Sequence, residues 1–231
     1  MVLGGAVLYG VFPGAYATLL PAFYLPIVLM LLALIFRGVA FEFRVMTRGT
    51  VREKRWTAGF MVGSAVAAFC QGAILGGVVQ GVKVVDGVFA GSAFDWLNPF
   101  SLVCGLAVMC GYALLGATWL VWRTTGPLEA SCRKWAWQLA IGLFCFIVIV
   151  SVWTPFLQAP YLRRWLSWPN FVFVAPVPVL VLVLGWFMRK GLLQGHTKGP
   201  FLCALGWFML CLSGFGISLW PYAVPPSLTV W

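Results

Sequence analysis

The stretch Leu31–Arg44, LLALIFRGVAFEFR, decides the class of the fold, because an apolar helix continues without a break into charged residues. An ionisable side chain near the bilayer core costs roughly 2.5 to 3.5 kcal/mol on insertion scales, so it persists where it is paired, reaches the interface or is functional. On a continuous helix Arg44 returns to the face of Arg37, while Glu42 lies well round from it. Two interpretations stay open: a stop-transfer signal with a snorkelling Arg37, and a polar cluster that faces a partner subunit or a proton route.

Composition places the chain among polytopic membrane proteins. Hydrophobic residues make up 62% of the 231 positions, charged residues make up 9%, and the mean hydropathy is +0.99. A soluble chain of this length has too small an interior for so many apolar side chains. The net charge of +10 does not indicate a partner nucleic acid, because the basic residues lie between apolar runs and form no single patch.

The apolar runs predict an all-α, polytopic membrane helix bundle with one partial and about six transmembrane helices, in a single domain over residues 1–231. Pro13, Pro21 and Pro26 interrupt the first run, which is longer than one span of about 20 residues. A partial helix to about Val11 and a break near Pro13 are therefore predicted. The predicted spans cover about residues 16–38, 56–82, 99–122, 135–157, 171–188 and 200–220.

The positions of Lys and Arg predict the orientation of these spans. With the Arg44 end in the cytoplasm, twelve basic residues lie inside and three outside, as the positive-inside rule requires. The inside residues are Arg37, Arg44, Arg48, Arg52, Lys54, Arg55, Arg123, Arg133, Lys134, Arg189, Lys190 and Lys198, and the outside residues are Lys83, Arg163 and Arg164. Tryptophans near the predicted span ends agree, since their amphipathic rings prefer the headgroup layer.

Small residues in the second span predict a close helix contact. The segment QGAILGGVVQG carries Gly72, Gly76, Gly77 and Gly81 as two interleaved small-xxx-small pairs. Such pairs let the backbones of neighbouring membrane helices approach. The pattern predicts packing and not a substrate site.

The sequence offers little that could hold a metal or a haem inside the membrane. The only histidine, His196, falls in the polar loop 194–198, so no predicted span carries the histidine that a buried haem usually requires. The seven cysteines form no CxxC or CxxCH motif, so no metal site is predicted. Phosphate-binding and hydrolase motifs are absent too, and no catalytic residue is predicted.

From these patterns the function stays open between an accessory subunit of a membrane complex and a secondary transporter. A transporter with inverted repeats should show paired broken helices around a polar site near the bilayer midplane. Pro13, Pro21 and Pro26 supply one broken element, and nothing corresponding appears in the second half of the sequence.

Several long runs resemble subunit II of the cytochrome bd quinol oxidases, and closely the cyanide-insensitive branch of that family. They are GGAVLYGVFPGAYATLLPAFYLPIVLMLLALIFRGVAFEFR (4–44), QGAILGGVVQG (71–81), FDWLNPFSLVCGL (94–106), GYALLGATWL (111–120), SVWTPF (151–156), SWPNFVFVAPVP (167–178) and GFGISLWPYAVPPSLTVW (214–231). Family members have a further first helix, a WDGNE motif just before the position of Met1, and a further last helix. The resemblance therefore implies an internal fragment of a longer subunit.

The resemblance implies a subunit that ligates no haem in a quinol:dioxygen oxidoreductase of a bacterial respiratory chain. Haem b and haem d would lie in subunit I, the haem-bearing partner of a heterodimer. Quinol is then the substrate, and some members hold a structural quinone. The chain would be an enzyme only within this complex, as a multi-pass protein of the bacterial inner membrane in contact with lipid and quinone. The alternative is a stand-alone secondary transporter or another membrane accessory subunit.

Two groups of residues are the candidate sites. The first is an intramembrane charge cluster or proton route of Arg37, Glu42 and Arg44, which the aspartate of the upstream motif would complete. The second is a helix-packing or subunit interface formed by Gly72, Gly76, Gly77, Gly81, Trp96, Asn98, Trp220 and Pro221.

Overall fold

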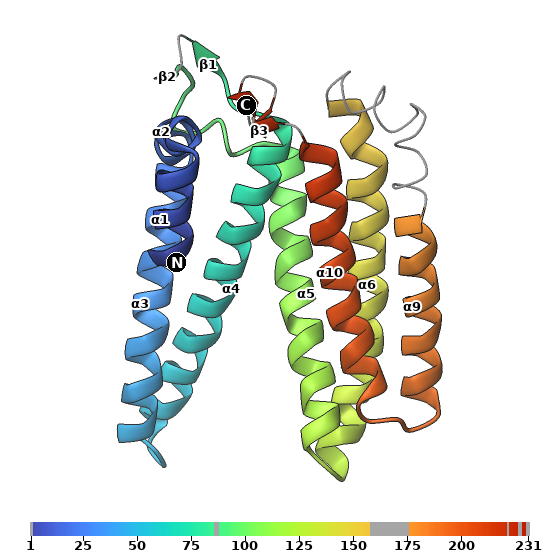
Figure 1. Cartoon of the computed structure of the whole chain (residues 1–231). Coiled ribbons are helices and arrows are strands. Elements are labelled where there is room, and N and C mark those ends of the chain that lie inside the picture. The colour runs from blue at the N-terminus through green and yellow to red at the C-terminus, as the bar shows by residue number, and fades with distance from the viewer. Residues whose placement is uncertain (1, 86–87, 158–175, 221, 226–227, 230–231) are drawn as a thin grey trace. The chain divides into compact units, whose positions relative to one another are not determined.

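The structure is a computed structural model that describes residues 2–85, 88–157, 176–220, 222–225 and 228–229. Over these ranges the chain is mainly helical (Figure 1). The helices are α1 (Val2–Val11), α2 (Pro13–Ala22), α3 (Tyr24–Met46), α4 (Val51–Gln80), α5 (Pro99–Arg123), α6 (Pro127–Leu157), α9 (Pro176–Leu193) and α10 (Gly199–Leu219). Two short antiparallel hairpins pair β1 (Val84–Val85) with β2 (Val88–Phe89), and β3 (Tyr222–Val224) with β4 (Leu228–Thr229).

Six of the described helices, α3 to α6, α9 and α10, are long and apolar enough to cross a bilayer. The backbone polar groups of a helix form hydrogen bonds within the helix, as lipid requires. Hydroxyl side chains on these helices also form hydrogen bonds within their own helix: Thr118 Oγ1 donates to the Leu114 carbonyl at 2.8 Å, and Thr154 Oγ1 donates to the Val150 carbonyl at 2.7 Å. The predicted all-α polytopic membrane fold is confirmed.

The first part of the chain differs from the prediction in its limits. The predicted partial helix to about Val11 is present as α1, but the short helix α2 follows it, and α3 begins only at Tyr24. The helix that carries the predicted span 16–38 therefore begins later than predicted, at Tyr24. Pro21 lies inside α2, and helical hydrogen bonding continues past it, since the Phe23 N–H still donates to the Leu19 carbonyl. The break falls at Phe23 because Pro26, in the first turn of α3, has no N–H for the Ala22 carbonyl.

Several helices extend further into their charged ends than the predicted spans. Helix α3 continues past Arg37 to Met46, α4 begins at Val51 and not near 56, and α6 begins at Pro127 and not near 135. Hydropathy places the end of a span where apolar residues end, whereas the helix itself can continue through the polar headgroup layer. The start of the predicted span 171–188 lies outside the described residues.

The chain divides into two compact units, which we call unit 1 (Met1–Met109 with Tyr222–Trp231) and unit 2 (Cys110–Pro221). In unit 1, α3 and α4 form a long helical hairpin (Figure 1), whose packed seam includes Ala33, Ala67 and Cys70. A second apolar cluster of unit 1 forms around Phe23, where α2 meets α3. The single domain predicted over residues 1–231 stays a prediction.

Unit 2 has one apolar core shared by α5, α6, α9 and α10. Leu114, Leu143, Met188 and Trp207 are among its buried members. The Trp207 side chain is also fixed by a buried hydrogen bond, because its Nε1 donates to the Val181 carbonyl at 2.9 Å. The paired helices α9 and α10 are thereby held together by packing and by one directed polar contact.

Candidate functional site

Arg37 lies on α3 against the neighbouring helix α4. Its guanidinium carbon is 5.3 Å from the centroid of the Phe60 ring, which is a cation–π distance. Gly63 makes room for it, since a Cβ added there would lie 3.4 Å from Arg37 Cβ and 3.0 Å from the Ala33 carbonyl oxygen. The α3–α4 hairpin thus places an aromatic ring beside the cation that the sequence singled out.

Glu42 and Arg44 lie beyond Arg37 on the same continuous helix, and all three side chains are exposed. Among the residues that the structure describes, the one side-chain ion pair joins Arg133 to Glu129, so Arg37, Glu42 and Arg44 are not linked to one another by an ion pair. The predicted charge cluster or proton route stays a prediction.

The predicted glycine contact of α4 faces the first half of α5. A Cβ added at Gly72 would collide with the Cys104 carbonyl oxygen and lie 2.8 Å from Gly105 Cα. One added at Gly76 would lie 2.8 Å from Ser101 Cα. Real Cβ atoms essentially never come so close to a backbone, so both positions require glycine. Here the two helices approach each other at backbone distance, as small-xxx-small pairs permit.

The other two glycines of the segment have different surroundings. A Cβ at Gly77 would collide with the Phe23 ring, so this glycine admits the central side chain of the second apolar cluster of unit 1. Gly81 ends α4 with a φ of 94°, and its N–H donates to the Gly77 carbonyl at 3.2 Å. A positive φ is accessible to glycine without steric cost, so Gly81 serves the helix end. A role of these glycines at a subunit interface stays a prediction.

Asn98 and Trp96 both lie just before α5. Asn98 Oδ1 accepts a hydrogen bond from the Ser101 backbone N–H at 2.9 Å, which is the contact of a helix N-cap. Asn98 Nδ2 also donates to the Asp95 carbonyl at 3.2 Å. Trp96 packs against the apolar cluster around Phe23. These two residues position the first turn of α5 against α4.

Trp220 ends α10 and is 56% exposed, with its backbone N–H donating to the Gly216 carbonyl at 3.1 Å. An exposed ring at the end of a span is typical of the headgroup layer. Pro221 lies outside the described residues. The predicted interface role of this pair is not tested by these contacts and stays a prediction.

Sequence reasoning missed the contacts of Arg133 at the basic end of unit 2. Its Nη1 donates to the Leu192 carbonyl at 2.9 Å, and its Nη2 is 2.5 Å from Glu129 Oε1. Longer contacts of 3.4 Å reach the Gly195 and His196 carbonyls. The last carbonyls of a helix lack partners within it and carry partial negative charge, so Arg133 ties α6 to the end of α9. The four-residue spacing from Glu129 was the only signal of this in the sequence.

Other basic side chains of unit 2 lie over tryptophan rings. The distances from the charged atom to the ring centroid are 5.7 Å for Arg123 over Trp119, 5.7 Å for Arg189 over Trp137, 5.3 Å for Lys190 over Trp186 and 5.9 Å for Lys198 over Trp122. All are within the range of cation–π attraction. Cations and rings therefore form one belt at this end of unit 2.

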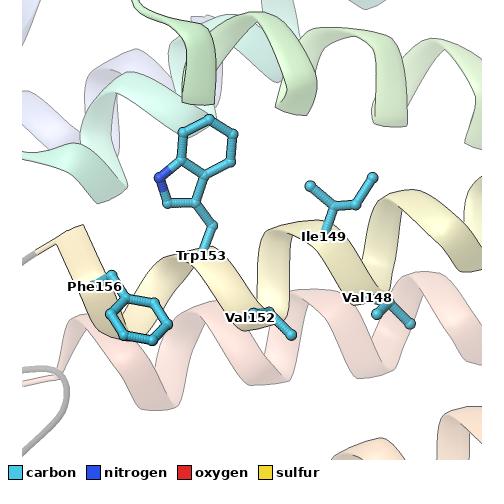
Figure 2. A pocket seen from close by; sticks show the side chains of 5 residues that line it. All are labelled: Val148, Ile149, Val152, Trp153 and Phe156. Carbon is cyan, nitrogen blue, oxygen red and sulfur yellow. The ribbon is translucent and has the colours of Figure 1, made fainter.

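The described residues bring together no group that could hold a haem or a metal ion. His196 is exposed in the loop between α9 and α10. Among the described residues, no three of His, Cys, Asp and Glu gather closely enough to hold a metal. A surface depression on α6 is lined by Val148, Ile149, Val152, Trp153 and Phe156 (Figure 2). Its lining has no carboxylate, imidazole or thiol, so it offers an apolar surface and no acid–base or ligand chemistry.

Comparison with known proteins assigns the chain to a family. The family model described as "Cytochrome bd terminal oxidase subunit II" matches residues 1–231. The "Cytochrome bd-I ubiquinol oxidase subunit 2" of Escherichia coli K12 is 33% identical over 159 residues, which are 66% of this chain and 42% of that protein. The "Cytochrome bd ubiquinol oxidase subunit 2" of Bacillus subtilis is 27% identical over 220 residues, which are 95% of this chain and 61% of that protein.

A "Probable cytochrome oxidase subunit 2" of Haemophilus influenzae is 30% identical over 158 residues, again 66% of this chain and 42% of that protein. The chain thus spans about two-fifths of the length of the Escherichia coli and Haemophilus influenzae relatives. The apolar spans and the bacterial relatives indicate a multi-pass protein of the bacterial inner membrane. Since the family model covers the whole sequence, the chain belongs to the cytochrome bd terminal oxidase subunit II family.

Proposed function

We propose that the chain acts within subunit II of a cytochrome bd-type quinol:dioxygen oxidoreductase and scaffolds a haem-bearing subunit I in a heterodimer. The observation that carries this proposal is the family match over residues 1–231. The names of the Escherichia coli and Bacillus subtilis relatives identify those proteins as ubiquinol oxidase subunits, which supports quinol as the substrate of the complex. A structural quinone and membership of the cyanide-insensitive branch stay predictions.

The residues of the chain support a role without haem ligation. Its single histidine is exposed in a loop, and membrane-embedded haems are usually held by histidine. This agrees with the family resemblance, which implies that haem b and haem d lie in subunit I, and we propose no step of oxygen reduction for residues of this chain. The proposed contribution of this chain to the activity is to keep the complex assembled in the membrane.

The packing of unit 1 supports the scaffold role. The backbone contact between Gly72 and Gly76 of α4 and the first half of α5 is tight enough to exclude any side chain. The N-cap from Asn98 then fixes where α5 begins. A rigid helix pair of this kind can present a constant surface to a partner subunit.

Purification from membranes of the natural host tests the proposal directly. We expect the tagged protein to co-purify with a larger subunit, to carry haem absorbance, and to consume oxygen when quinol is added. A colourless protein that binds no second subunit would contradict the proposal and favour a stand-alone transporter. Uptake of labelled solutes into vesicles that contain only this protein would then identify the transported class.

A further inference from the structure

The turn between α3 and α4 carries a dense group of basic side chains. We call it the hairpin basic patch, and it consists of Arg44, Arg48, Arg52, Lys54 and Arg55. All five residues are exposed. The patch lies within a single helical hairpin of unit 1, so its arrangement follows from the two helices and their short turn.

None of the five cations has an ion-pair partner within the part of the chain that the structure describes. The cation–π contacts of the described residues also fall on other side chains. The nearest carboxylate along α4, Glu53, is engaged by the turn itself, since its Oε2 accepts a hydrogen bond from the Gly49 N–H at 2.8 Å. Glu42 lies two residues before Arg44 and forms no ion pair with it. The patch thus holds five cations against the two carboxylates Glu42 and Glu53, neither of which forms an ion pair with it among the described residues, so its net charge is positive.

An aromatic pair indicates how deep the patch lies in the membrane. The rings of Phe43 and Trp56 stack with centroids 4.9 Å apart, joining α3 to α4 just before the turn. Tryptophan prefers the membrane–water interface. With a rise of about 1.5 Å per residue, Arg52 lies about 6 Å beyond Trp56 along the helix. That distance matches a headgroup layer of roughly 5 to 8 Å on each side of the hydrocarbon core.

The turn is held in shape before any ligand binds. Thr47 Oγ1 donates to the Phe43 carbonyl at 2.7 Å, and Thr50 Oγ1 donates to the Thr47 carbonyl at 2.7 Å. The Glu53 contact to Gly49 closes the turn from the other side. A surface that is already ordered loses less entropy on binding.

We propose that the hairpin basic patch binds the phosphate groups of anionic phospholipids. Four of its five cations are arginines, whose planar guanidinium groups can donate two parallel hydrogen bonds to one phosphate. Basic clusters next to a membrane span attract anionic lipid at short range. This proposal requires only the membrane location of the protein and does not depend on its role in an oxidase.

The test uses the purified complex after delipidation, titrated with phosphatidylglycerol or phosphatidylcholine and followed by native mass spectrometry. The patch variant combines Arg48→Gln, Arg52→Gln and Arg55→Gln. A matched control removes three charges from unit 2 with Arg189→Gln, Lys190→Gln and Lys198→Gln, whose cations lie over rings. A second control, with lysine at positions 48, 52 and 55, keeps the charge that guides membrane insertion.

We expect the wild type to bind phosphatidylglycerol more tightly than phosphatidylcholine. In the patch variant the affinity for phosphatidylglycerol should fall about a hundredfold, because each of the three removed cations contributes about fivefold. The phosphatidylglycerol affinity of the unit 2 control should fall by less than about tenfold, and that of the lysine variant by only a few-fold. Phosphatidylcholine binding should not change. The wild-type preference should also collapse at about 1 M salt, where the Debye length is about 3 Å.

Equal binding of the two lipids by the wild type would overturn the proposal, as would a phosphatidylglycerol preference that the patch variant retains. If the patch variant instead loses its partner subunit while its lipid preference is unchanged, the patch binds protein and the lipid proposal is wrong. If the patch variant does not insert into the membrane, the proposal is tested by the salt titration of the wild type and by the lipid preference of the lysine variant. A wild-type preference that persists at about 1 M salt contradicts binding by exposed cations.

Discussion

At the α3–α4 turn of unit 1, five exposed cations have no ion-pair or ring partner among the described residues, whereas the basic end of unit 2 holds its cations on tryptophan rings and backbone carbonyls. The sequence predicts the cytoplasmic side for both groups of basic residues. The same predicted location therefore goes with different contacts of the individual side chains. In unit 2, Arg133, Arg189 and Lys198 reach across to another helix, whereas Arg123 and Lys190 lie over rings of their own helix. In unit 1 the five cations have no such contacts among the described residues and can bind a ligand.

The two units also differ in how their helices are held together. Unit 1 relies on glycines that bring α4 and α5 to backbone contact. Unit 2 relies on long side chains that reach from one helix to the next, such as Arg133 and Trp207. Substitutions that add volume should therefore damage unit 1 most, and substitutions that remove a donor should damage unit 2 most.

The largest effect is expected from Gly76→Leu in unit 1. The added side chain would meet the α5 backbone at Ser101, which cannot move without displacing the helix. Overpacking of this kind typically costs 1 to 3 kcal/mol, and we expect about 3 kcal/mol because the obstacle is backbone. Unfolding of the complex in mixed micelles with increasing SDS measures this loss, and haem content per complex should fall with it.

Gly38→Leu is the matched control for that prediction, because a Cβ at Gly38 meets nothing within 4 Å. It should leave stability unchanged or raise it by up to about 1 kcal/mol through helix propensity. If Gly76→Leu is tolerated as well as Gly38→Leu, the backbone contact between α4 and α5 does not exist in the folded protein.

The next effect in size is expected from Arg133→Met in unit 2. The change leaves the Glu129 carboxylate and the Leu192 carbonyl without their donor. Hydrogen bonds to charged groups contribute about 1.5 to 3 kcal/mol, and partial exposure of this pair places the expected loss of unfolding free energy near the lower figure.

Arg52→Met in the hairpin basic patch is the counterpart of Arg133→Met, since Arg52 has no ion-pair partner among the described residues. It should change the unfolding free energy by no more than about 0.5 kcal/mol. Equal losses from Arg133→Met and Arg52→Met in the same SDS titration would remove the distinction between the two basic ends.

A small effect, only slightly above that of Arg52→Met, is expected from Arg37→Leu, because Arg37 is exposed and its one described partner is the Phe60 ring. Loss of an exposed cation–π contact costs about 0.5 to 1 kcal/mol, and Arg37→Lys should recover part of it. Oxygen consumption with quinol should stay near the wild-type rate. A loss of about 3 to 5 kcal/mol, with oxygen consumption abolished, would instead establish the predicted charge cluster of Arg37, Glu42 and Arg44.

Much of the fold was predictable, because lipid imposes a simple rule on the chain. Apolar runs such as the one that ends at Arg37 must be helical, and their number and order are read directly from hydropathy. The limits of α2, α3, α4 and α6 were not predictable in this way. They depend on where prolines interrupt hydrogen bonding and on how far a helix continues into the headgroup layer.

The candidate site was predictable only in part. Spacing identified Gly72, Gly76, Gly77 and Gly81 as one group, yet the structure gives three of them a steric role and gives Gly81 a conformational one. Asn98 was named as a candidate interface residue, and its hydrogen bond from the Ser101 N–H identifies it as an N-cap. The carbonyl partners of Arg133 could not be predicted, since they lie about sixty residues away in the sequence.

The sequence by itself determined the membrane class, the number of spans and the family, because each of these depends on composition and on local runs of residues. The orientation of the spans stays a prediction. Only the tertiary structure decided which glycine faces which backbone, which cation lies on a ring, and which cations of the hairpin basic patch have no ion-pair partner among the described residues. Those properties depend on distances between segments far apart in the chain, and hydropathy and spacing along one helix contain no information on such distances.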